Sequence, residues 1–316
     1  MICTVSLNPA VDKYLRVASL RRGEHLEAEE VLASAGGKAI NVAGVLRVLE
    51  EEVELLGFFG GFTGDYILGE VAREGIRADP VEVSGLTRTA FVLVEADGSE
   101  TEVVEPGAPV GADDIAALRA KLRAAAARAA VVVLSGSVPA GCPDDIYVQL
   151  LGDCGGRCPV IVDTSRVHLR TLLAARPEPG PTMIKPNRRE AEAAVGHALA
   201  RADDLARVLE QFAACGVAMP VVSDGAAGLW ARLDGQVWHA RPPALVRVNS
   251  VGSGDAAVAG LAAGLARQSP PEEMLRLAAA CGAANVLTKE CGAVRREDVE
   301  RLLGQIEVVR AESRGE

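Results

Sequence analysis

The chain has 316 residues and a formal net charge of −10 at pH 7, with 49% hydrophobic and 3% aromatic residues. This composition predicts an ordered globule, and the acidic balance argues against a nucleic-acid backbone as a general partner. No apolar run is long enough to cross a bilayer, and the start MICTVSLNPAV lacks the basic flank of a secretion signal. We therefore expect a cytoplasmic protein that binds neither membrane nor nucleic acid.

The cysteines and histidines do not form a recognisable site. Seven cysteines, an odd number, are scattered from Cys3 to Cys291, which does not suit a disulfide framework in a chain of this length. The close pair Cys154 and Cys158 has no second pair or nearby histidine at zinc spacing. The four histidines stand alone, so we assign no metal to Cys or His and no Ser/His/Asp nucleophile.

In chain order, short apolar runs typical of buried strands alternate with helical stretches. The strand-like runs are CTVSL near the start and residues 131–136, 159–163 and 219–225, and the expected helices include 39–49, 64–74, 112–128, 203–215 and 271–287. Strand followed by helix, repeated along the chain, predicts a parallel sheet covered by helices on both faces.

Two segments break this alternation, at 13–34 and 87–106. The second is typical of a hairpin, with strand-like residues on either side of Ala96-Asp97-Gly98. We expect the two segments to form a small β-sheet inserted into the α/β core. Such a sheet would leave an exposed edge and an apolar face that a second copy of the chain could cover.

Two glycine-rich turns, each followed by a helical pattern, are the strongest functional signals. In VNSVGSGDAAVAGLAAGL at 248–265, free backbone N–H groups at the helix start would attract an anion, and the adjacent Asp255 could receive a proton. In AGGKAINVAGVL at 35–46, two glycines let the backbone approach a ligand beside Lys38, and Asn41 lies on the first turn of the next helix.

Two familiar nucleotide-binding motifs do not fit these turns. GSGDAA matches the dinucleotide fingerprint G-x-G-x-x-A, but residues 270–275, PPEEML, start a helix where that fold requires a strand ending in an acid. This counts against a dehydrogenase. A P-loop is excluded because Lys38 is followed by Ala39, and Leu32 stands where the first glycine should be.

The two turns, taken together, resemble the signatures of the PfkB (ribokinase-like) carbohydrate kinases. NSVGSGDAAVAG is similar to the C-terminal signature and SAGGKAINVA to the N-terminal one. Further family landmarks follow in order, namely LNPAVD at 7–12, GGFTGD at 60–65, TRT at 87–89, SGSVP at 135–139, KPNRRE at 185–190 and VSDGAAG at 222–228. LNPAVD, GGFTG and the TEVVEPG segment resemble the branch of 1-phosphofructokinases and tagatose-6-phosphate kinases.

The resemblance implies a fold and a reaction. The fold would be one ribokinase-like domain over 1–316, a three-layer α/β/α core with a mostly parallel central sheet and a β-sheet lid at about 13–34 and 87–106. Asp255 would be the base that takes the proton of the acceptor hydroxyl. The N–H groups of Gly252, Ser253 and Gly254 would form the anion hole for the γ-phosphoryl group of ATP, a role that suits a helix N-terminus.

The remaining site residues follow from the resemblance position by position. On the sugar side are Asp12, Gly37, Lys38 and Asn41, with Arg88 and Ser137 at the phosphate or far end of the sugar. On the nucleotide side are Lys185, Asn187 and Glu190, with Glu190 acting on Mg²⁺ through water, then Ser223 and Gly225 at the ATP phosphates, the turn residue Gly228, and Asn285 at the adenine pocket. The expected partners are ATP, a sugar phosphate and a second copy bound through the lid.

Departures from the family pattern leave the substrate open. Ala39 replaces a glycine, Gly44 a basic residue, and Ala28 stands in an acidic stretch where relatives carry arginine. Fewer cations mean weaker capture of a substrate phosphate. We predict phosphorylation of fructose 1-phosphate to fructose 1,6-bisphosphate. The alternatives are tagatose 6-phosphate, fructose 6-phosphate, an unphosphorylated sugar favoured by the acidic lid, and an inactive ligand-binding sensor, against which the intact Asp255 argues.

Overall fold

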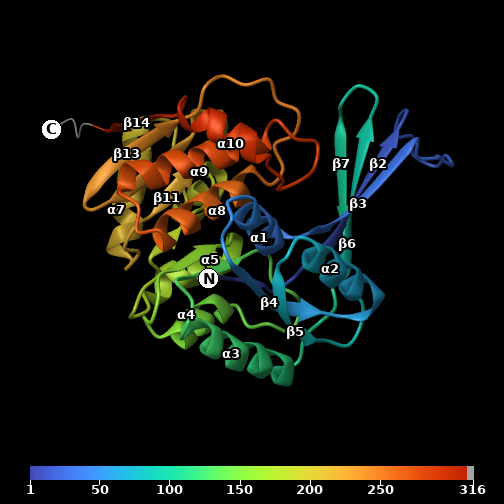
Figure 1. Ribbon diagram of the computed structural model, residues 1–316, viewed down its shortest axis with the longest axis horizontal. Helices are drawn as coiled ribbons and strands as arrows, with labels where there is room; N and C mark the ends of the chain where they lie inside the picture. Colours follow the sequence, from blue (N-terminus) through green and yellow to red (C-terminus); the bar gives the residue numbers. More distant parts are fainter. Residues whose placement is uncertain (312–316) are drawn as a thin grey trace.

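The computed structural model describes residues 1–311, and its centre is a six-stranded parallel sheet (Figure 1). The strand order is β10 (Met183–Ile184), β9 (Val160–Asp163), β8 (Val131–Ser135), β1 (Ile2–Ser6), β4 (Val53–Phe59) and β5 (Arg77–Glu82). The apolar runs at the start and at 131–136 and 159–163 are therefore central strands. Their near-continuous apolar character fits a sheet buried on both faces.

Helices cover both faces and give the expected three layers. One hydrophobic cluster contains residues from α1 (Lys38–Val48), α2 (Gly61–Arg73), α8 (Ser253–Ala266), α9 (Pro271–Asn285) and α10 (Arg296–Leu303). The other contains residues from α3 (Ala112–Ala126), α4 (Ile146–Cys154), α5 (Arg166–Ala175), α6 (Arg188–Val195) and α7 (Ala202–Ala214). Along β8, Val131 and Val133 belong to the first cluster and Val132 and Leu134 to the second, as the two-residue period of a strand requires.

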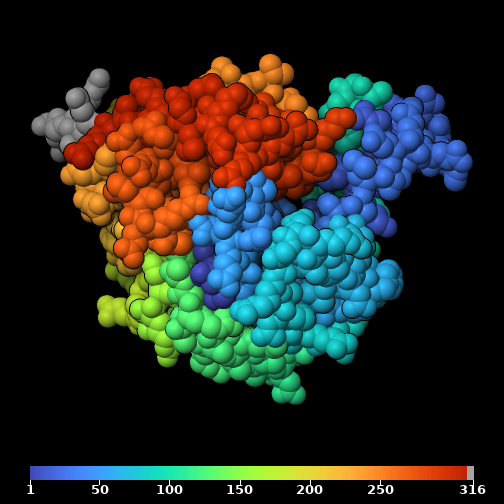
Figure 2. All heavy atoms as spheres, in the orientation of Figure 1, coloured from blue at the N-terminus to red at the C-terminus, as the bar shows by residue number. Residues whose placement is uncertain are grey.

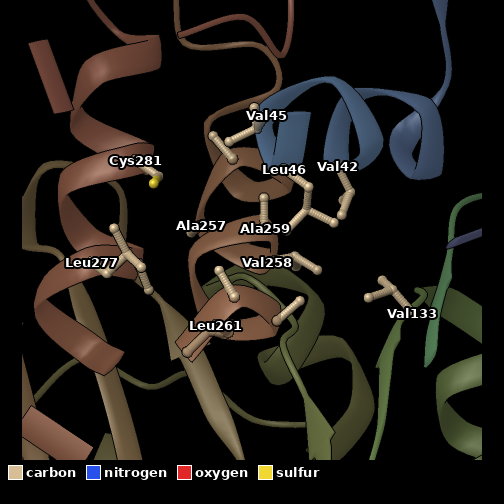
Figure 3. Packing of buried hydrophobic residues seen from close by; sticks show 14 of the residues in the cluster. Val42, Val45, Leu46, Val133, Ala257, Val258, Ala259, Leu261, Leu277 and Cys281 are labelled. Atoms are coloured by element: carbon tan, nitrogen blue, oxygen red, sulfur yellow. The ribbon is translucent and has the colours of Figure 1, made fainter. Parts of the chain in front are cut away.

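Helix α8 lies deepest, because its small residues let neighbouring helices approach closely. A side chain on Gly260 would collide with the α9 backbone, since its Cβ would lie 2.5 Å from Ala278 Cα. Figure 3 shows Val258 and Leu261 of α8 among side chains of α1 and α9. The small-residue pattern at 255–264 therefore positions this helix, and with it Asp255 at its N-terminal end.

A second sheet continues the first beyond β10. Its strands are antiparallel, in the order β11 (Val221–Ser223), β12 (Leu229–Leu233), β13 (Gln236–Arg241) and β14 (Glu307–Arg310), with a 3₁₀ helix at Gly225–Ala227. A parallel bridge between Asn187 and Ser223 joins the two sheets. The β12–β13 hairpin is absent from the expected elements, although Asp234-Gly235 between two apolar runs is a strong hairpin signal, and both residues have the positive φ of such a turn.

A third sheet, here called the outer sheet, projects from the body of the molecule (Figures 1 and 2). Its order is β3 (Glu30–Gly36), β2 (Ala10–Val17), β6 (Arg88–Glu95) and β7 (Glu100–Val104). The predicted α/β fold, with a mostly parallel central sheet and a separate small sheet, is confirmed. The first two strands of the outer sheet, β2 and β3, run from Ala10 to Gly36 and so extend beyond the expected segment of about 13–34, and β3 leads directly into the first glycine turn. In residues 1–311 no helix has the length and apolarity needed to span a membrane.

Candidate active site

The second glycine turn, at Gly252–Gly254, leads into α8 and packs closely against a neighbouring segment. Gly252, the N-cap, has φ 85°, and a Cβ there would lie 2.2 Å from the backbone nitrogen of Gly292. Only glycine fits both constraints. The first intrahelical hydrogen bond runs from the N–H of Ala256 to the carbonyl of Gly252, at 2.9 Å. The N–H groups before Ala256 have no partner within the helix, which makes this end suited to an anion.

Asp255 is buried at this helix end, with 6% of its surface exposed. Its Oδ2 accepts a hydrogen bond of 2.8 Å from Nδ2 of Asn41. Burial raises the pKa of Asp255 to about 6, and Asp163 raises it too, while Lys38, the Asn41 hydrogen bond and Lys185 lower it. A carboxylate with such a pKa is ionised at neutral pH and is more basic than an exposed aspartate, as a general base requires.

The first glycine turn starts helix α1 beside Asp255. Gly37 caps the helix with φ 103°, and a Cβ there would lie 3.2 Å from Pro9 Cα. The helix then places Lys38 and Asn41 one turn apart on the side of α8. Gly292 closes over the same point, because a Cβ on it would lie 2.3 Å from Asn41 Cγ. Three chain segments that are far apart in the sequence therefore meet at Asp255.

A buried carboxylate that the sequence analysis did not predict pairs with two lysines at this point. Asp163 ends β9 and is 1% exposed, and its oxygens lie 3.5 Å from Lys38 Nζ and 3.9 Å from Lys185 Nζ. The Asp163 carboxylate raises the pKa of Lys38, and this effect outweighs the partial desolvation of the ammonium, which lowers it. One sequence feature could have identified Asp163: it is an acidic residue at the carboxyl end of a buried parallel strand, where α/β sheets bind ligands.

The sugar-side residues expected at the start of the outer sheet also come together. Asp12 lies against the first turn, since a Cβ on Gly36 would be 2.1 Å from its Oδ2. Burial raises the pKa of Asp12 to about 6, although the Arg88 guanidinium lowers it. Arg88 Nη2 donates to Ser137 Oγ at 3.2 Å. Asn8, which was not predicted, donates to the same oxygen at 3.4 Å.

The residues expected on the nucleotide side lie at the junction of the two sheets. Lys185 is 3% exposed and follows β10. Asn187 and Glu190 form a capping box at α6: Asn187 Oδ1 accepts from the Glu190 N–H at 2.9 Å, and Glu190 Oε2 accepts from the Asn187 N–H at 2.8 Å. The N–H of Ser223 donates to the carbonyl of Pro186 at 3.0 Å, so β11 lies beside this segment.

The last three expected residues have mostly local roles in the structure. Gly225 starts the 3₁₀ helix with φ 53°. Gly228 has φ 93° and packs so tightly that a Cβ would lie 2.0 Å from the Ala240 carbonyl oxygen. Asn285 is fully buried, and its Nδ2 donates to the Val251 carbonyl at 3.0 Å and to Ser253 Oγ at 2.9 Å. Asn285 thus holds the turn before α8 from beneath.

The glycine at position 44 lies beside an acidic residue that follows α2. It lies in α1, and a Cβ on it would be 3.3 Å from Glu74 Oε2 of the segment after α2. A basic residue here would start next to Glu74 rather than at Asp255 or Arg88. Ala28, the other position without a basic residue, lies in the segment that leads into β3 of the outer sheet.

Comparison with known proteins gives matches over nearly the whole chain. The family described as pfkB family carbohydrate kinase matches residues 2–297. Over 283 residues the chain is 38% identical to 1-phosphofructokinase of Xanthomonas campestris pv. campestris, covering 88% of each protein. The structure of Escherichia coli phosphofructokinase-2 in complex with fructose-6-phosphate superposes with a TM-score of 0.88 at 26% identity, over 96% of this chain and 98% of that one. The structure of a possible 1-phosphofructokinase of Thermotoga maritima superposes with a TM-score of 0.88 at 25% identity, over 99% of this chain and 100% of that one.

Proposed function

This chain belongs to the pfkB family of carbohydrate kinases, and we propose that it transfers the γ-phosphoryl group of ATP to fructose 1-phosphate, giving fructose 1,6-bisphosphate. As a member of that family it is a sugar kinase, a phosphotransferase with an alcohol group as acceptor. The observation that carries the proposal is the meeting of the two glycine turns at the Asn41–Asp255 hydrogen bond of 2.8 Å, beside two lysines.

Asp255 is the proposed general base. The acceptor hydroxyl of the sugar loses its proton to the carboxylate as its oxygen attacks the γ-phosphorus and the bond from that phosphorus to the leaving oxygen of ADP breaks. Asn41 holds the other side of the carboxylate and fixes its orientation. The N–H groups at Gly252, Ser253 and Gly254 would stabilise the charge on the transferring group, because they are fixed by the fold before the substrate binds.

The two lysines supply positive charge from opposite sides of the transferring group. Lys38 comes from the sugar-side turn and Lys185 from the strand end on the nucleotide side. A Cβ on Gly254 would lie 3.2 Å from Lys185 Nζ, so this ammonium lies next to the proposed anion hole. Phosphoryl transfer depends mainly on positioning and charge stabilisation, which is what this arrangement offers.

The phosphate of the sugar is assigned to Arg88 and Ser137, and the hydroxyls to Asp12 and Asn41. Arg88 Nε is buried and has no hydrogen-bond partner among residues 1–311, and a buried donor without a partner is well suited to bind a ligand. A guanidinium binds phosphate through two parallel hydrogen bonds. The 38% identity to a 1-phosphofructokinase favours fructose 1-phosphate over the other phosphosugars.

On the nucleotide side, the ATP phosphates are assigned to Lys185, Asn187, Ser223 and Gly225, with the turn at Gly228. Glu190 is assigned to Mg²⁺, acting through water, because its carboxylate offers the hard oxygen that Mg²⁺ prefers. Its charge is also among those that raise the pKa of Lys38, which supports the assignment. When bound, Mg²⁺ would neutralise phosphate charge during transfer. Asn285 would support the turn from beneath the adenine side.

The outer sheet is proposed to act as a lid and to pair two copies of the chain. Its strand register puts two sets of residues on opposite faces. One face carries Asp12 and Glu102 toward the site, and the other carries Leu15, Val31, Phe91, Leu93 and Val103. Val31 and Val103 are 56% and 55% exposed. A second copy would cover this apolar face, and closure of the lid would exclude water from the transferring phosphate.

A substrate panel tests the proposal. ADP release would be measured with Mg²⁺-ATP against fructose 1-phosphate, tagatose 6-phosphate, fructose 6-phosphate and the unphosphorylated sugars. We expect the highest kcat/KM with fructose 1-phosphate. Preference for another phosphosugar would change the substrate but keep the site, whereas turnover of neutral sugars alone would show that the acidic lid has replaced phosphate recognition.

A further inference from the structure

Asp163 is paired differently from Asp153 and Glu54, two other buried carboxylates among the described residues. Asp153, which is 7% exposed at the side chain, binds Arg119 and Arg123 at 2.6 and 2.7 Å. The Glu54 side chain is 3% exposed and binds Arg77 and Arg128 at 2.8 and 2.6 Å. Asp163 is more buried, yet its lysine partners lie 3.5 and 3.9 Å away, and its Oδ1 accepts no hydrogen bond within the described residues 1–311.

A buried carboxylate whose cationic partners lie at long distances destabilises the folded state. A buried ion pair offsets the loss of hydration only when its geometry is close and its remaining lone pairs are hydrogen-bonded. Asp153 meets that condition and Asp163 does not: within residues 1–311 the Asp163 carboxylate accepts only one hydrogen bond, of 3.5 Å, from Ser135 Oγ. A poorly satisfied buried charge is better explained by a functional requirement.

The two lysines that Asp163 joins come from the two halves of the site. Lys38 is the first residue of α1 on the sugar side. Lys185 follows β10 on the nucleotide side and lies against Gly254 of the anion hole. Lysine side chains are long and flexible, so an ammonium group stays at one point only if a fixed group holds it.

We propose that Asp163 is a positioning residue, whose buried carboxylate holds the ammonium groups of Lys38 and Lys185 on either side of the transferring phosphoryl group. This inference rests on the proposed function and assigns a role to a residue outside the family motifs described above. The long distances are part of the role: each ammonium is aimed by Asp163 but keeps donors free for the substrate phosphates.

The same carboxylate also influences the base. The charged and hydrogen-bonding groups that face Asp255 are Lys38 and Asn41 from α1, Asp163 from β9 and Lys185 from the segment after β10. Among these, only Asp163 acts with burial to raise the pKa of Asp255. Replacing Asp163 with a neutral residue would therefore lower the pKa of Asp255, and would do so even if the lysines kept their places.

The test is Asp163→Asn, with Asp153→Asn as the matched control at a buried carboxylate held by two cations away from the site. In Asp163→Asn we expect kcat to fall about 10- to 100-fold, the effect of misplaced catalytic groups. KM should not rise for either anionic substrate, because the variant removes a negative charge. The acid limb of kcat/KM should move to lower pH. Asp153→Asn should lose thermal stability but keep both the kcat of the wild type per folded molecule and its pH profile.

The comparison of variants is made with one substrate, because phosphate groups ionise near pH 6 and contribute equally to each profile. An Asp163→Asn enzyme with an unmoved acid limb, and with no more loss of kcat than Asp153→Asn, would overturn the inference. If Asp163→Asn does not fold because it leaves lysines unpaired, Asp163→Asn/Lys185→Met removes the opposite charges together and would be compared with Lys185→Met. The double variant should lose a further 10-fold or so in kcat, through Lys38; equal kcat values would contradict the proposal.

A readout without turnover separates this inference from the proposed function. Titration of the Asp255 carboxyl by ¹³C NMR, assigned with Asp255→Asn, should give a lower pKa in Asp163→Asn than in the wild type. That shift is expected even if fructose 1-phosphate proves not to be the substrate. An unchanged Asp255 titration would contradict the coupling in either case.

Discussion

Asn41 Nδ2 donates a hydrogen bond of 2.8 Å to Asp255 Oδ2 across 214 residues of sequence. The bond joins the N-terminal ends of α1 and α8, so it connects the turn assigned to the sugar with the turn assigned to the transferring phosphate. Both groups are buried, and a buried bond to a charged acceptor is stronger than one exposed to water. In the proposed reaction, the second oxygen of Asp255 accepts the proton of the acceptor hydroxyl.

Asp255→Asn should abolish most of the activity. The amide keeps the shape of the carboxylate and can still accept from Asn41, but it cannot take a proton. General base catalysis typically contributes 10²- to 10⁴-fold, so we expect kcat to fall by about 10³-fold with KM little changed. Steady-state kinetics on a folded variant, checked by circular dichroism, measures this. A loss expressed mainly in KM would assign Asp255 to binding instead.

The same substitution should stabilise the protein at alkaline pH. The folded-state pKa of Asp255 is about 6, above the value of about 4 in an unfolded chain. The group therefore favours folding only while it is protonated, and the free energy of unfolding of the wild type falls as pH rises from about 4 through 6. Asp255→Asn should exceed the wild type by about 2 kcal/mol at pH 8 and by little at pH 4 in urea titrations. Equal urea midpoints for the two proteins at pH 8 would show that burial of the ionised carboxylate does not destabilise the fold.

Arg88→Met should weaken sugar phosphate binding and leave ATP binding intact. Loss of a charged hydrogen bond costs about 1.5–3 kcal/mol, which predicts a 10- to 100-fold lower kcat/KM for the phosphosugar. Arg16→Met is the control in the same sheet, since Arg16 is exposed and pairs with Glu30. Equal losses in the two variants would mean that Arg88 supports the sheet rather than the substrate.

Gly252→Ala should impair both folding and catalysis. The φ of 85° is unfavourable for alanine, and its Cβ would collide with the Gly292 backbone. Such strain costs about 1–3 kcal/mol or more and would displace the anion hole. Gly69→Ala in α2 is the control, because a Cβ there meets nothing within 4 Å. That change should stabilise by about 0.5–1 kcal/mol. Thermal melts and kcat values distinguish the two variants. A fully active Gly252→Ala enzyme would contradict the turn geometry described above.

Val31→Lys/Val103→Lys should separate the proposed dimer. Both residues lie on the exposed apolar face of the outer sheet, and two lysines there would resist burial against a second copy. Sedimentation velocity would report the change from dimer to monomer. Val246→Lys, at a position that is 86% exposed and outside that sheet, should leave the oligomeric state unchanged. A wild-type monomer at micromolar concentration would contradict the pairing.

Much of the fold was predictable because local patterns and tertiary structure agree. Apolar runs such as 131–136 and 159–163 can only be strands buried on both faces, and they are. The bounds of the outer sheet were harder, because β2 begins inside LNPAVD, where the turn residues Asn8 and Pro9 obscure the strand. The β12–β13 hairpin carried a readable signal in Asp234-Gly235.

The site was predictable where motifs name residues and unpredictable where only the fold brings them together. Asp255 and Lys38 stand in recognisable turns. Asp163 and Asn8 do not, because a strand-end acid or a loop asparagine has no sequence feature that identifies its partners, such as Ser135, 28 positions from Asp163, or Ser137, 129 positions from Asn8. Asn285 shows a further limit: its helix position is readable, but its contact with Val251 and Ser253 depends on how α9 packs beneath the turn.

We propose that Asp255 is the base of a kinase acting on fructose 1-phosphate. The most direct measurement is ADP release with Mg²⁺-ATP and fructose 1-phosphate, for the wild type and Asp255→Asn in parallel, with fructose as the neutral substrate. We predict turnover of fructose 1-phosphate by the wild type, its loss in the variant, and little turnover of fructose. Turnover of fructose alone, or equal rates for the two proteins, would contradict the account.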